Sequence, residues 1–561
     1  MAIVGGGPVG IALAIALAQH DIECAVIERH RNPQQIPKGQ NLTQRTMEHF
    51  RRWGIERQLR DARTLSPGQQ AVGMTAYGSL LGQYQYTWFE RGLVDPFYWA
   101  KNERLPQYAT ERVLRDRLAE FPTATTLYGW SAVGVTQDEF GAIVAMRSRS
   151  GRSGSVRAEF VIGCDGSRSM VRAAAGITQT FSDEERRMVL LVFRSTEFER
   201  VMERYPDTTF VNILNPELNG YWQFFGRVDA RDTWFFHAPV AKDSIAETLD
   251  LHALLSRAVG EDFDFTVEHL GFWDLRFALA DTYRSGRLFI AGDAAHSHPP
   301  YGGYGVNTGF EDATNLAWKL AAALGGWAGE HLLDSYDAER RPVFASTRDN
   351  FIEKSIHSDR DFLASFDPIR STDEFADAWE KRAHGTPDEI LRFEPNYEGS
   401  PITVGDADRR PSALGRHENR ARAGHHLAPV RREDGTDPFE SISGSFCLLT
   451  ADAAGAEPFV TAAAALGVPL RVVITDAEGT HKMESPHVLV RPDQFIAWAG
   501  QASAVDARHV LEAAVGQPGE AANDAIATPR RQSRLAGGAG TPADSAGPGP
   551  ITRPAPAATT N

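Results

Sequence analysis

The chain has 561 residues, of which 42% are hydrophobic and 23% charged, which is ordinary for a soluble globular protein with about two to four domains. Its net charge of −15 argues against nucleic acid or an anionic membrane as a partner, because both require a basic face. The three cysteines form no CxxC pair, which excludes a disulfide framework and a cysteine-rich zinc site and predicts a cytoplasmic protein.

The chain opens with an apolar stretch. A secretory signal would need a basic start and a cleavage site, and a membrane helix needs about 20 apolar residues, so neither pattern is met. Residues 2–4 and 23–28 instead read as buried strands, and residues 11–19 read as a helix. This order predicts a βαβ unit and no membrane span. Because the first strand begins at Ala2, we expect a few native residues before it.

Glycines with GxGxxG spacing, Gly5, Gly7 and Gly10, fill the turn between the first strand and the helix. Gly5 permits a tight turn, Gly7 lets a pyrophosphate approach the backbone, and Gly10 lets the helix pack on the strand. The start of the helix supplies free N–H groups for the phosphates. Glu28 ends the second strand, where an acid can bind a ribose diol. The pattern predicts a dinucleotide site that suits FAD or NAD better than NADP.

Two later strands also end in an acid beside a glycine. Residues 161–163 read as a strand that leads into an Asp165-Gly166 turn and a helix, although an ordinary Asx turn also explains this pattern. Residues 288–291 read as a strand followed by Asp293, whose carboxylate is well placed to bond a sugar-like chain of hydroxyl groups.

A loop rich in Gly and Pro follows Asp293 and leads into a helix expected over residues 307–324. Glycines around Gly305 would bring free N–H groups at the helix start close to a ligand, where they could stabilise negative charge. His296 and His298 would need a third ligand of suitable spacing to bind a metal, and none is apparent, so no metal site is expected.

Together these motifs resemble the fingerprints of the single-component FAD-dependent aromatic hydroxylases. The motifs are GGGPVG with a distal Glu28, CDGSRSMVR at 164–172 and GDAAHSHPPYGGYGVNTGF at 292–310. Shorter matches are KGQNLTQRTME at 38–48, LPQ at 105–107 and LLDSY at 332–336. The resemblance covers residues 1–350 and departs at Tyr304, where the family more often has Gln.

The resemblance implies that an extended FAD is held by residues from most of these segments. The expected coenzyme-binding residues are Gly5, Gly7, Pro8, Val9, Gly10, Glu28, Lys38, Arg45, Gln107, Asp165, Asp293, Pro300, Gly303, Gly305, Val306 and Asn307. Pro299 and Pro300 would flank the flavin ring where oxygen is activated, which makes Pro299 a candidate catalytic residue.

Residues 180–280 contain short strands rich in aromatic and β-branched residues, at 210–214, 221–225 and 233–237. They predict a mostly antiparallel sheet that roofs the coenzyme and carries the substrate, with alternate side chains facing it. The catalytic candidates Tyr221 and His237 could orient or deprotonate a phenol. The expected substrate-binding residues are Asn212, Tyr221, Gln223, Phe225 and His237.

Beyond residue 350 the chain reads as a charged helical connector at 351–400 and then as alternating strands and helices at 401–516. The segment VLVRPDQFIAW at 488–498 resembles the thioredoxin-like C-terminal domain of the phenol hydroxylase branch. Because Cys447 stands alone in this region, we expect structural or dimer-supporting roles here rather than redox chemistry. Residues 517–561 are rich in Ala, Gly, Pro and Thr and are expected to be disordered.

The expected fold is therefore α/β. A Rossmann-like FAD-binding domain would use residues 1–179, with inserted loops near 65–105, and residues 281–350. It would be interleaved with the β-sheet substrate domain at 180–280 and followed by the thioredoxin-like domain.

The resemblance implies a monooxygenase that uses NADPH or NADH and O2 to hydroxylate a small phenol-like aromatic through a flavin C4a-hydroperoxide. A nitro or halogen substituent at the attacked carbon would be lost. A single GxGxxG and the lack of a WxWxIP motif disfavour Baeyer–Villiger, N-hydroxylating and halogenating flavoenzymes. Two alternatives stay open: a related enzyme that tailors a larger polyketide or antibiotic, and a non-catalytic flavin-binding protein. A homodimer is compatible with all three.

Overall fold

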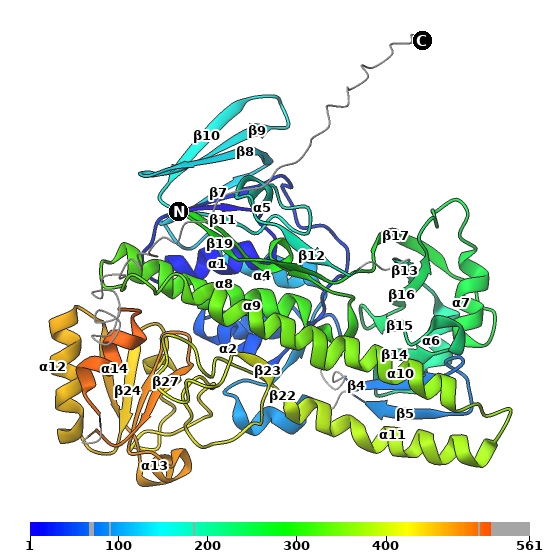
Figure 1. The fold of residues 1–561 in the computed structure, drawn as a ribbon. Helices are drawn as coiled ribbons and strands as arrows, with labels where there is room; N and C mark the ends of the chain where they lie inside the picture. The colour runs from blue at the N-terminus through cyan, green and yellow to red at the C-terminus, as the bar shows by residue number, and fades with distance from the viewer. Residues whose placement is uncertain (67–71, 89–90, 183–185, 503–504, 518–561) are drawn as a thin grey trace, which may run out of the picture. The chain divides into compact units, whose positions relative to one another are not determined.

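The structure is a computed structural model that describes residues 1–66, 72–88, 91–182, 186–502 and 505–517. The apolar N-terminal stretch forms a strand, a helix and a second strand (Figure 1): β1 (Ala2–Val4), α1 (Pro8–Ala18) and β2 (Cys24–Glu28). Every residue of α1 from Gly10 onward is buried, which explains why this helix has no polar face. The predicted disordered tail lies outside the described residues, except for Gln517.

The central sheet has the strand order β19-β20-β11-β1-β2-β7. Its other members are β7 (Ala124–Tyr128), β11 (Val161–Gly163), β19 (Arg284–Ser285) and β20 (Leu288–Ile290). All neighbours are parallel except the pair formed by the edge strand β19 with β20. The carboxyl ends of the parallel strands therefore meet at one edge, where the glycine- and aspartate-containing turns follow.

A second, seven-stranded sheet has the order β17-β13-β16-β15-β14-β4-β5. Its strands are β4 (Val72–Tyr77), β5 (Gln85–Trp88), β13 (Arg186–Arg194), β14 (Thr208–Leu214), β15 (Trp222–Arg227), β16 (Thr233–Ala241) and β17 (Thr266–Asp274). All pairs are antiparallel except β14 with β4. The predicted antiparallel sheet is thus present, but β4 and β5 were expected to be loops. Strands β4 and β5 were missed because their pairing partners are far away in the sequence.

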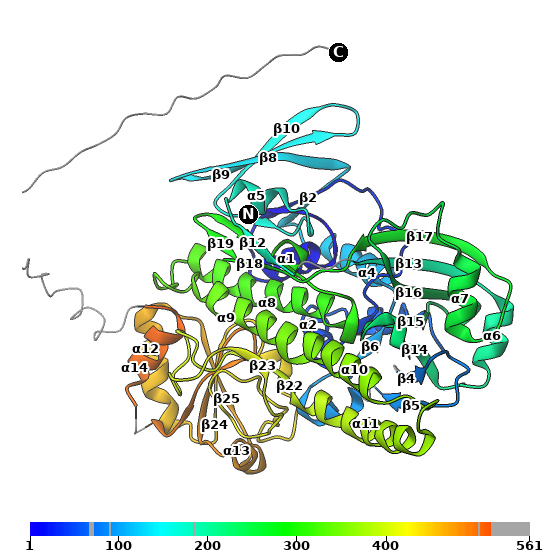
Figure 2. The same ribbon diagram turned by 45° about the vertical axis from the view of Figure 1, so that its right-hand side comes forward.

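Two helices, α6 (Thr196–Met202) and α7 (Leu251–Val259), cover the outer face of this sheet (Figure 2). Phe198 of α6 and Leu255 of α7 are fully buried in one cluster with Phe225 and Phe236. The aromatic residues of this sheet therefore lie on both of its faces. One face packs on helices α6 and α7, and the other face is turned toward the parallel sheet.

A long buried helix, α8 (Gly305–Leu324), packs beside α1. A Cβ on Gly309 would lie 2.5 Å from a methyl carbon of Val9, so the glycine permits the close approach of α8 to the start of α1. The helices α9 (Ser335–Thr347), α10 (Lys354–Ser365) and α11 (Thr372–Arg392) follow. Among the described helices, none combines the length and apolar character needed to cross a membrane.

The C-terminal region contains a four-stranded mixed sheet with the order β25-β24-β26-β27. Its elements are β24 (Phe446–Thr450), α12 (Glu457–Leu466), β25 (Leu470–Ile474), α13 (Ala477–Met483), β26 (His487–Val490), β27 (Ile496–Gly500) and α14 (Ala507–Ala514). A fully buried ion cluster joins it to α8 and α9, with Arg491 Nη1 2.5 Å from Glu339 Oε1 and Lys319 Nζ 2.7 Å from Glu339 Oε2.

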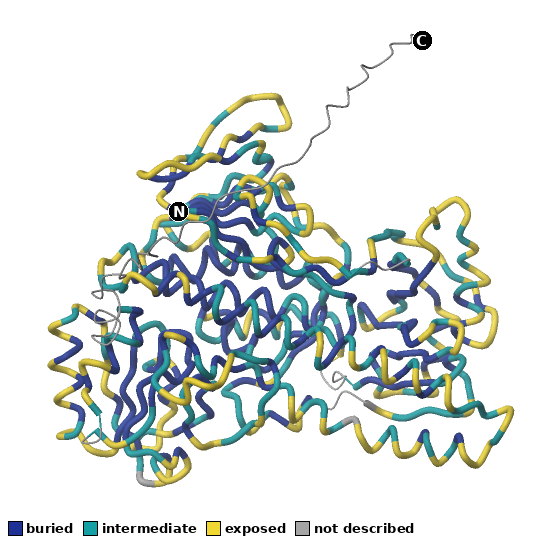
Figure 3. Tube along the Cα trace, in the orientation of Figure 1, coloured by how far each residue is buried: buried dark blue, intermediate teal, exposed yellow. Residues whose placement is uncertain are grey.

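The remaining elements include an outer sheet and several short elements near the cavities. An outer sheet consists of β8 (Trp130–Asp138), β9 (Gly141–Ser148) and β10 (Ser153–Ala158), and much of it is exposed (Figure 3). The shorter elements that border the large cavity are β3 (Asn41–Leu42), β6 (Glu103–Arg104), α4 (Gln107–Leu118) and α5 (Met170–Ala174). Helix α2 (Gln44–Arg52) follows β3 and contributes to the wall of a smaller cavity.

Candidate active site

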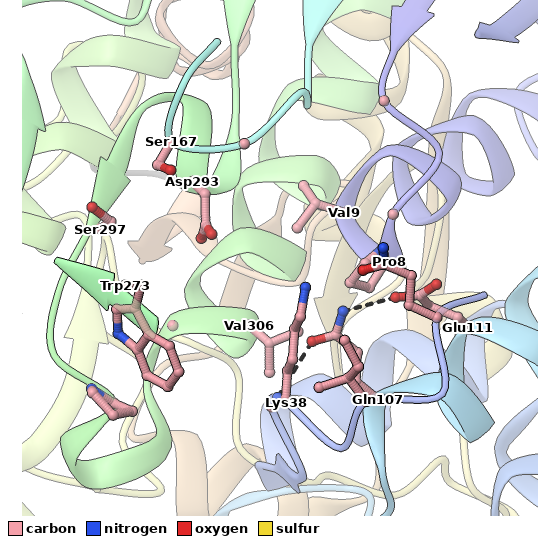
Figure 4. A pocket seen from close by; sticks show the side chains of 18 of the residues that line it. Pro8, Val9, Lys38, Gln107, Glu111, Ser167, Trp273, Asp293, Ser297 and Val306 are labelled. Atoms are coloured by element: carbon pink, nitrogen blue, oxygen red, sulfur yellow. Dashed lines mark hydrogen bonds between the residues drawn. The ribbon is translucent and has the colours of Figure 1, made fainter. Parts of the chain in front are cut away.

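A cavity of about 1120 Å³ lies between the carboxyl edge of the parallel sheet and the inner face of the seven-stranded sheet. Figure 4 shows residues from α1, α4 and α8 converging on it, together with the loops that carry Lys38 and Asp293. Pockets for a single drug-sized ligand have volumes of about 300–1000 Å³. This cavity exceeds that range, so it has room for an extended ligand and a second organic molecule.

The turn before α1 forms one end of the cavity. Gly5 adopts φ +105°, and a Cβ there would lie 2.2 Å from the carbonyl oxygen of Cys164. A Cβ on Gly7 would meet no atom of the described residues within 4 Å, because Gly7 borders the open cavity. No described side chain caps α1 at Gly7, so its first N–H groups can bind an anion. A Cβ on Gly10 would lie 2.0 Å from the carbonyl oxygen of Gly5, which makes Gly10 a packing residue that does not line the cavity.

Glu28 stands at the edge of this turn. Its Oε2 accepts a hydrogen bond from Gly6 N and its Oε1 accepts one from His30 N, both at 2.7 Å. A carboxylate has about four acceptor sites, so Glu28 can still accept hydrogen bonds from a diol in the cavity.

Lys38 and Gln107 lie on the opposite wall, near Val306 of α8 (Figure 4). Gln107 donates from Nε2 to Glu111 Oε1 at 2.7 Å and accepts at Oε1 from Gly39 N at 3.3 Å. Burial raises the pKa of the Glu111 carboxyl. These bonds fix the orientation of the Gln107 amide, while the Lys38 side chain extends into the cavity.

Asp165 and Asp293 line the cavity at the ends of β11 and β20. Asp165 accepts hydrogen bonds from Ser169 Oγ at 2.5 Å and Met170 N at 2.7 Å, so it orders the start of α5. The side chain of Asp293 is accessible from the cavity, but the surrounding protein separates it from bulk solvent and raises the pKa of its carboxyl. Its uncommitted oxygens can accept from hydroxyl groups.

The start of α8 closes this end of the cavity. Gly303, at φ +66°, is followed by Gly305 and Val306, and all three line the cavity together with Pro300. No described side chain caps α8, so the N–H groups of its first turn are free to face a ligand.

Alternate residues of the seven-stranded sheet form the roof of the cavity. The roof residues on β14, β15 and β16 are Phe210, Asn212, Trp222, Phe224, Phe235 and His237. The imidazole of His237 stacks on Phe224 at 4.5 Å between ring centroids and meets Trp273 edge-on at 5.1 Å. Burial lowers the pKa of His237 to about 3, and no described residue partners its Nδ1. This histidine is therefore neutral at physiological pH.

Three substrate candidates do not line the cavity, because the alternation of β15 places its odd-numbered residues on the other face. Phe225 is fully buried in the cluster with α6 and α7, and Gln223 is also absent from the cavity wall. Tyr221 precedes β15 and packs near Tyr301, at 6.2 Å between ring centroids, outside the cavity. A change of strand register by one residue turns every side chain to the opposite face of the sheet. The run of aromatic residues therefore did not indicate which residues face the cavity.

Pro299 and Asn307 also lie off the cavity wall. Pro299 is buried, and its carbonyl accepts from Tyr301 N at 2.8 Å, so Pro300 is the proline that faces the cavity. The amide of Asn307 donates to the carbonyls of Asn41 and Gly303, at 2.8 and 2.7 Å, and so braces the start of α8 from behind.

Arg45 was expected at the coenzyme, but it does not line the large cavity. Its guanidinium bonds Glu311 Oε2 at 3.1 Å, Glu48 Oε2 at 3.0 Å and Gln494 Oε1 at 2.6 Å. It therefore links α2 and α8 to the C-terminal region, at a smaller cavity of about 90 Å³.

Several cavity residues were not anticipated. Trp273 of β17 completes the aromatic wall, and the alternation of apolar and charged residues at 273–277 could have indicated it. His298 lines the cavity with its Nε2 lacking a partner among the described residues, and burial lowers its pKa to about 4. Arg104 also lines the cavity, and no sequence signal distinguished it.

The comparisons with known proteins agree with this geometry. Residues 1–350 match the family described as FAD binding domain, and residues 421–518 match aromatic-ring hydroxylase, C-terminal. A putative polyketide hydroxylase of Streptomyces halstedii is 32% identical over 547 residues, which covers 89% of this chain and 93% of the relative. A 4-methyl-5-nitrocatechol 5-monooxygenase of Burkholderia sp is 32% identical over 547 residues and covers 91% and 95%. The flavin-dependent monooxygenase PieE, solved with FAD and substrate, matches with a TM-score of 0.75 at 26% identity, and the match covers 92% of this chain and 99% of PieE.

Proposed function

This chain belongs to the FAD-dependent aromatic-ring hydroxylases, and from that premise we propose that it uses NAD(P)H and O2 to hydroxylate a phenol-like ring. A nitro group or halogen at the attacked carbon would leave in the same reaction. One observation carries the proposal: a single cavity joins the uncapped start of α1 to a roof of aromatic side chains around a neutral histidine.

The residues at the cavity fit FAD, the coenzyme of this family. Gly7 leaves open space where any side chain would project, and the free N–H groups of α1 suit a diphosphate. Glu28 would hold the adenosine ribose, while Asp293 and Gln107 would hold the ribityl chain. The other cavity residues that would contact the coenzyme are Gly5, Pro8, Val9, Lys38, Asp165, Pro300, Gly303, Gly305 and Val306.

FAD reduced by NAD(P)H supplies the activation of O2. The protein contributes a dry and oriented site. Trp222, Phe224 and Trp273 cover the space beside the start of α8 with apolar surface, which excludes the water that would divert activated oxygen to hydrogen peroxide.

His237 is the group proposed to act on the phenol. Because it is neutral, a ring nitrogen can accept the hydrogen bond of a substrate hydroxyl and draw electron density into the ring. Asn212 belongs to the same cross-strand row, since it pairs with Phe224 and Phe224 pairs with His237. Its amide can bond the same hydroxyl and fix the ring.

The test is a screen of the purified, FAD-loaded protein. Phenols, nitrocatechols and polycyclic phenols are added with NADH or NADPH under 18O2, and the products are analysed by mass spectrometry. We expect at least one aromatic to stimulate NAD(P)H oxidation and to gain one labelled oxygen atom. FAD binding without stimulation by any compound would instead support a non-catalytic flavin-binding protein.

A polyketide substrate is the second candidate, and the volume of the cavity favours testing it. One relative is named as a putative polyketide hydroxylase and another as a nitrocatechol monooxygenase. Preference for the polycyclic members of the screen over single-ring phenols would identify the polyketide-type function.

A further inference from the structure

The roof of the cavity contains a buried cation that the proposed function does not use. Arg104, at the end of β6, is 6% exposed. Several arginines line the cavity, and among those that the structure describes only Arg104 is buried. No carboxylate of the described residues forms an ion pair with its guanidinium. The neighbouring Glu103 is engaged elsewhere, with Arg60 Nη1 at 3.1 Å and with Arg63.

The guanidinium of Arg104 is held against the roof sheet. Its Nη1 donates to the carbonyl of Thr209 at 3.2 Å and its Nη2 to the carbonyl of Arg227 at 2.8 Å, both in the roof sheet. Its guanidinium lies 5.8 Å from the centroid of the Phe210 ring. These bonds use two of the five N–H groups of a guanidinium and hold it in place, so others can bind a ligand.

Arg104 keeps its charge in this environment. Burial, and to a lesser extent the positive charge of Arg227, lowers the pKa of Arg104 to about 9, which leaves it protonated at neutral pH. A buried cation without an anionic partner is costly, and a carboxylate on a ligand would supply that partner with two parallel hydrogen bonds.

The strand pairing sets the distance between this cation and the histidine of the roof. Phe210, Gly226 and Phe235 form one cross-strand row, and Asn212, Phe224 and His237 form the next. A Cβ on Gly226 would lie 3.0 Å from Arg104 Nη2, so Arg104 belongs to the first row. The rows are two residues apart, or about 7 Å at about 3.3 Å per residue.

We propose that Arg104 is the binding site for a carboxylate of the aromatic substrate, carried on the side of the ring system remote from the hydroxyl that faces His237. The substrate class is therefore a hydroxylated aromatic acid, with the two groups separated by at least one ring. The inference rests on the proposed function, because it takes the cavity to hold an aromatic substrate beside FAD.

The test measures binding without turnover. Oxidised, FAD-loaded protein is titrated with 6-hydroxy-2-naphthoate and with its neutral isostere 6-hydroxy-2-naphthamide, and Kd is obtained from the flavin absorbance change and by calorimetry. We expect the acid to bind at least about tenfold tighter than the amide. Arg104→Gln should bring the two Kd values within about twofold, and Arg104→Lys, which keeps the charge, should retain part of the preference.

Arg227→Gln is the matched control. Arg227 is equally buried in the same sheet, but it pairs with Glu199 at 2.7 Å and does not line the cavity, so its variant should keep the preference. Equal binding of acid and amide by the unmodified protein, or binding of neither, would overturn the inference. So would a preference that survives in Arg104→Gln, or loss of FAD from that variant, which would place Arg104 at the coenzyme.

These outcomes are distinct from failure of the proposed function. The 18O2 screen can detect hydroxylation of other phenols even when the naphthoate pair shows no selectivity. Conversely, selective binding of the acid with no oxygen transfer to any aromatic would leave Arg104 as a carboxylate site in a protein that lacks the proposed activity.

Discussion

Oδ2 of Asp312 lies 2.7 Å from Nε2 of His296, and this contact ties the loop after β20 to the middle of α8. Asp312 also accepts from Gly292 N at 3.0 Å and from Arg340 Nε at 2.8 Å. Burial raises the pKa of the Asp312 carboxyl, but His296 and Arg340 outweigh this and hold it below its usual range. The loop that carries Asp293 is therefore anchored by an ionised, buried carboxylate.

Asp312→Asn should destabilise the protein, because it leaves the buried guanidinium of Arg340 without its anion. We expect the free energy of unfolding to fall by about 3 to 5 kcal/mol in urea titrations. Asp334→Asn is the control, since Asp334 pairs with Arg284 but is 64% exposed, and its loss should cost less than about 1 kcal/mol. Equal effects of the two variants would contradict this account of the loop.

Two glycines of the first turn should differ in what their substitution disrupts. The side chain added by Gly7→Val would extend only into the open cavity. The apoprotein of this variant should therefore have unchanged thermal stability, while the purified variant should lack stoichiometric FAD. Gly5→Ala should instead lower apoprotein stability by more than about 1 kcal/mol, because of its positive φ and the clash with Cys164.

The measurements are flavin content by absorbance and apoprotein stability by thermal unfolding. Gly134→Val, in β8, is the matched control for added bulk in open space, and it should retain FAD. Retention of a full complement of FAD by Gly7→Val would show that the coenzyme does not approach this turn.

His237→Gln should impair oxygen transfer more than coenzyme reduction. Without the imidazole the phenol loses its hydrogen-bond acceptor, and we expect the hydroxylation rate to fall by about 10²-fold. NAD(P)H oxidation should continue with release of hydrogen peroxide, which a peroxidase-coupled assay quantifies. His252→Gln on the outer helix α7 should leave the ratio of product to peroxide unchanged, and a similar fall in that variant would argue against a specific role.

The apoprotein should also lose stability in acid through His237. Its folded-state pKa of about 3 lies below the value of 6.5 for a free histidine, so between these pH values the unfolded chain binds the extra proton. Stability is therefore complete above pH 6.5 and decreases as pH falls. At pH 5 this group lowers the free energy of unfolding by about 2 kcal/mol relative to pH 7.5.

Urea unfolding of the apoprotein at the two pH values measures this difference. His237→Gln should reduce the difference by about the same 2 kcal/mol, and the exposed His252→Gln should not change it. A pH dependence that is identical in all three proteins would show that His237 titrates normally in the folded state.

Arg491→Met should loosen the attachment of the C-terminal region. The variant leaves Asp493 and Glu339 buried with less positive charge, and we expect a loss of about 3 kcal/mol. Limited proteolysis should then cut within residues 400–420 sooner than in the unmodified protein. Arg508→Met removes an exposed pair with Glu512 and should leave both measurements unchanged.

The sequence predicted the parts of the site that depend on local backbone chemistry. The GxGxxG turn, the strand that ends in Glu28 and the glycines before α8 each require only a short segment, and the structure brings all of them to one cavity. The α/β fold and the family are confirmed. The domain boundaries and the binding roles of individual residues remain predictions.

Other features could not be predicted because they depend on partners distant in the chain. Arg45 sits in a matching motif, yet its ion pair with Glu311 and its bonds to residues 493–494 turn it away from the cavity. Strands β4 and β5 join the roof sheet through the pairing of β4 with β14, which begins more than a hundred residues later in the chain.

The amino-acid sequence by itself thus predicted a dinucleotide coenzyme, and by resemblance FAD, together with the end of the cavity that would hold it. It could do so because turns with special φ values and helix starts are encoded by adjacent residues. Only the tertiary structure decided which face of each roof strand meets the substrate. Phe224 and His237 face the cavity, whereas Phe225 faces the helices on the other side of the sheet. This orientation follows from the register between neighbouring strands, which the local sequence does not specify.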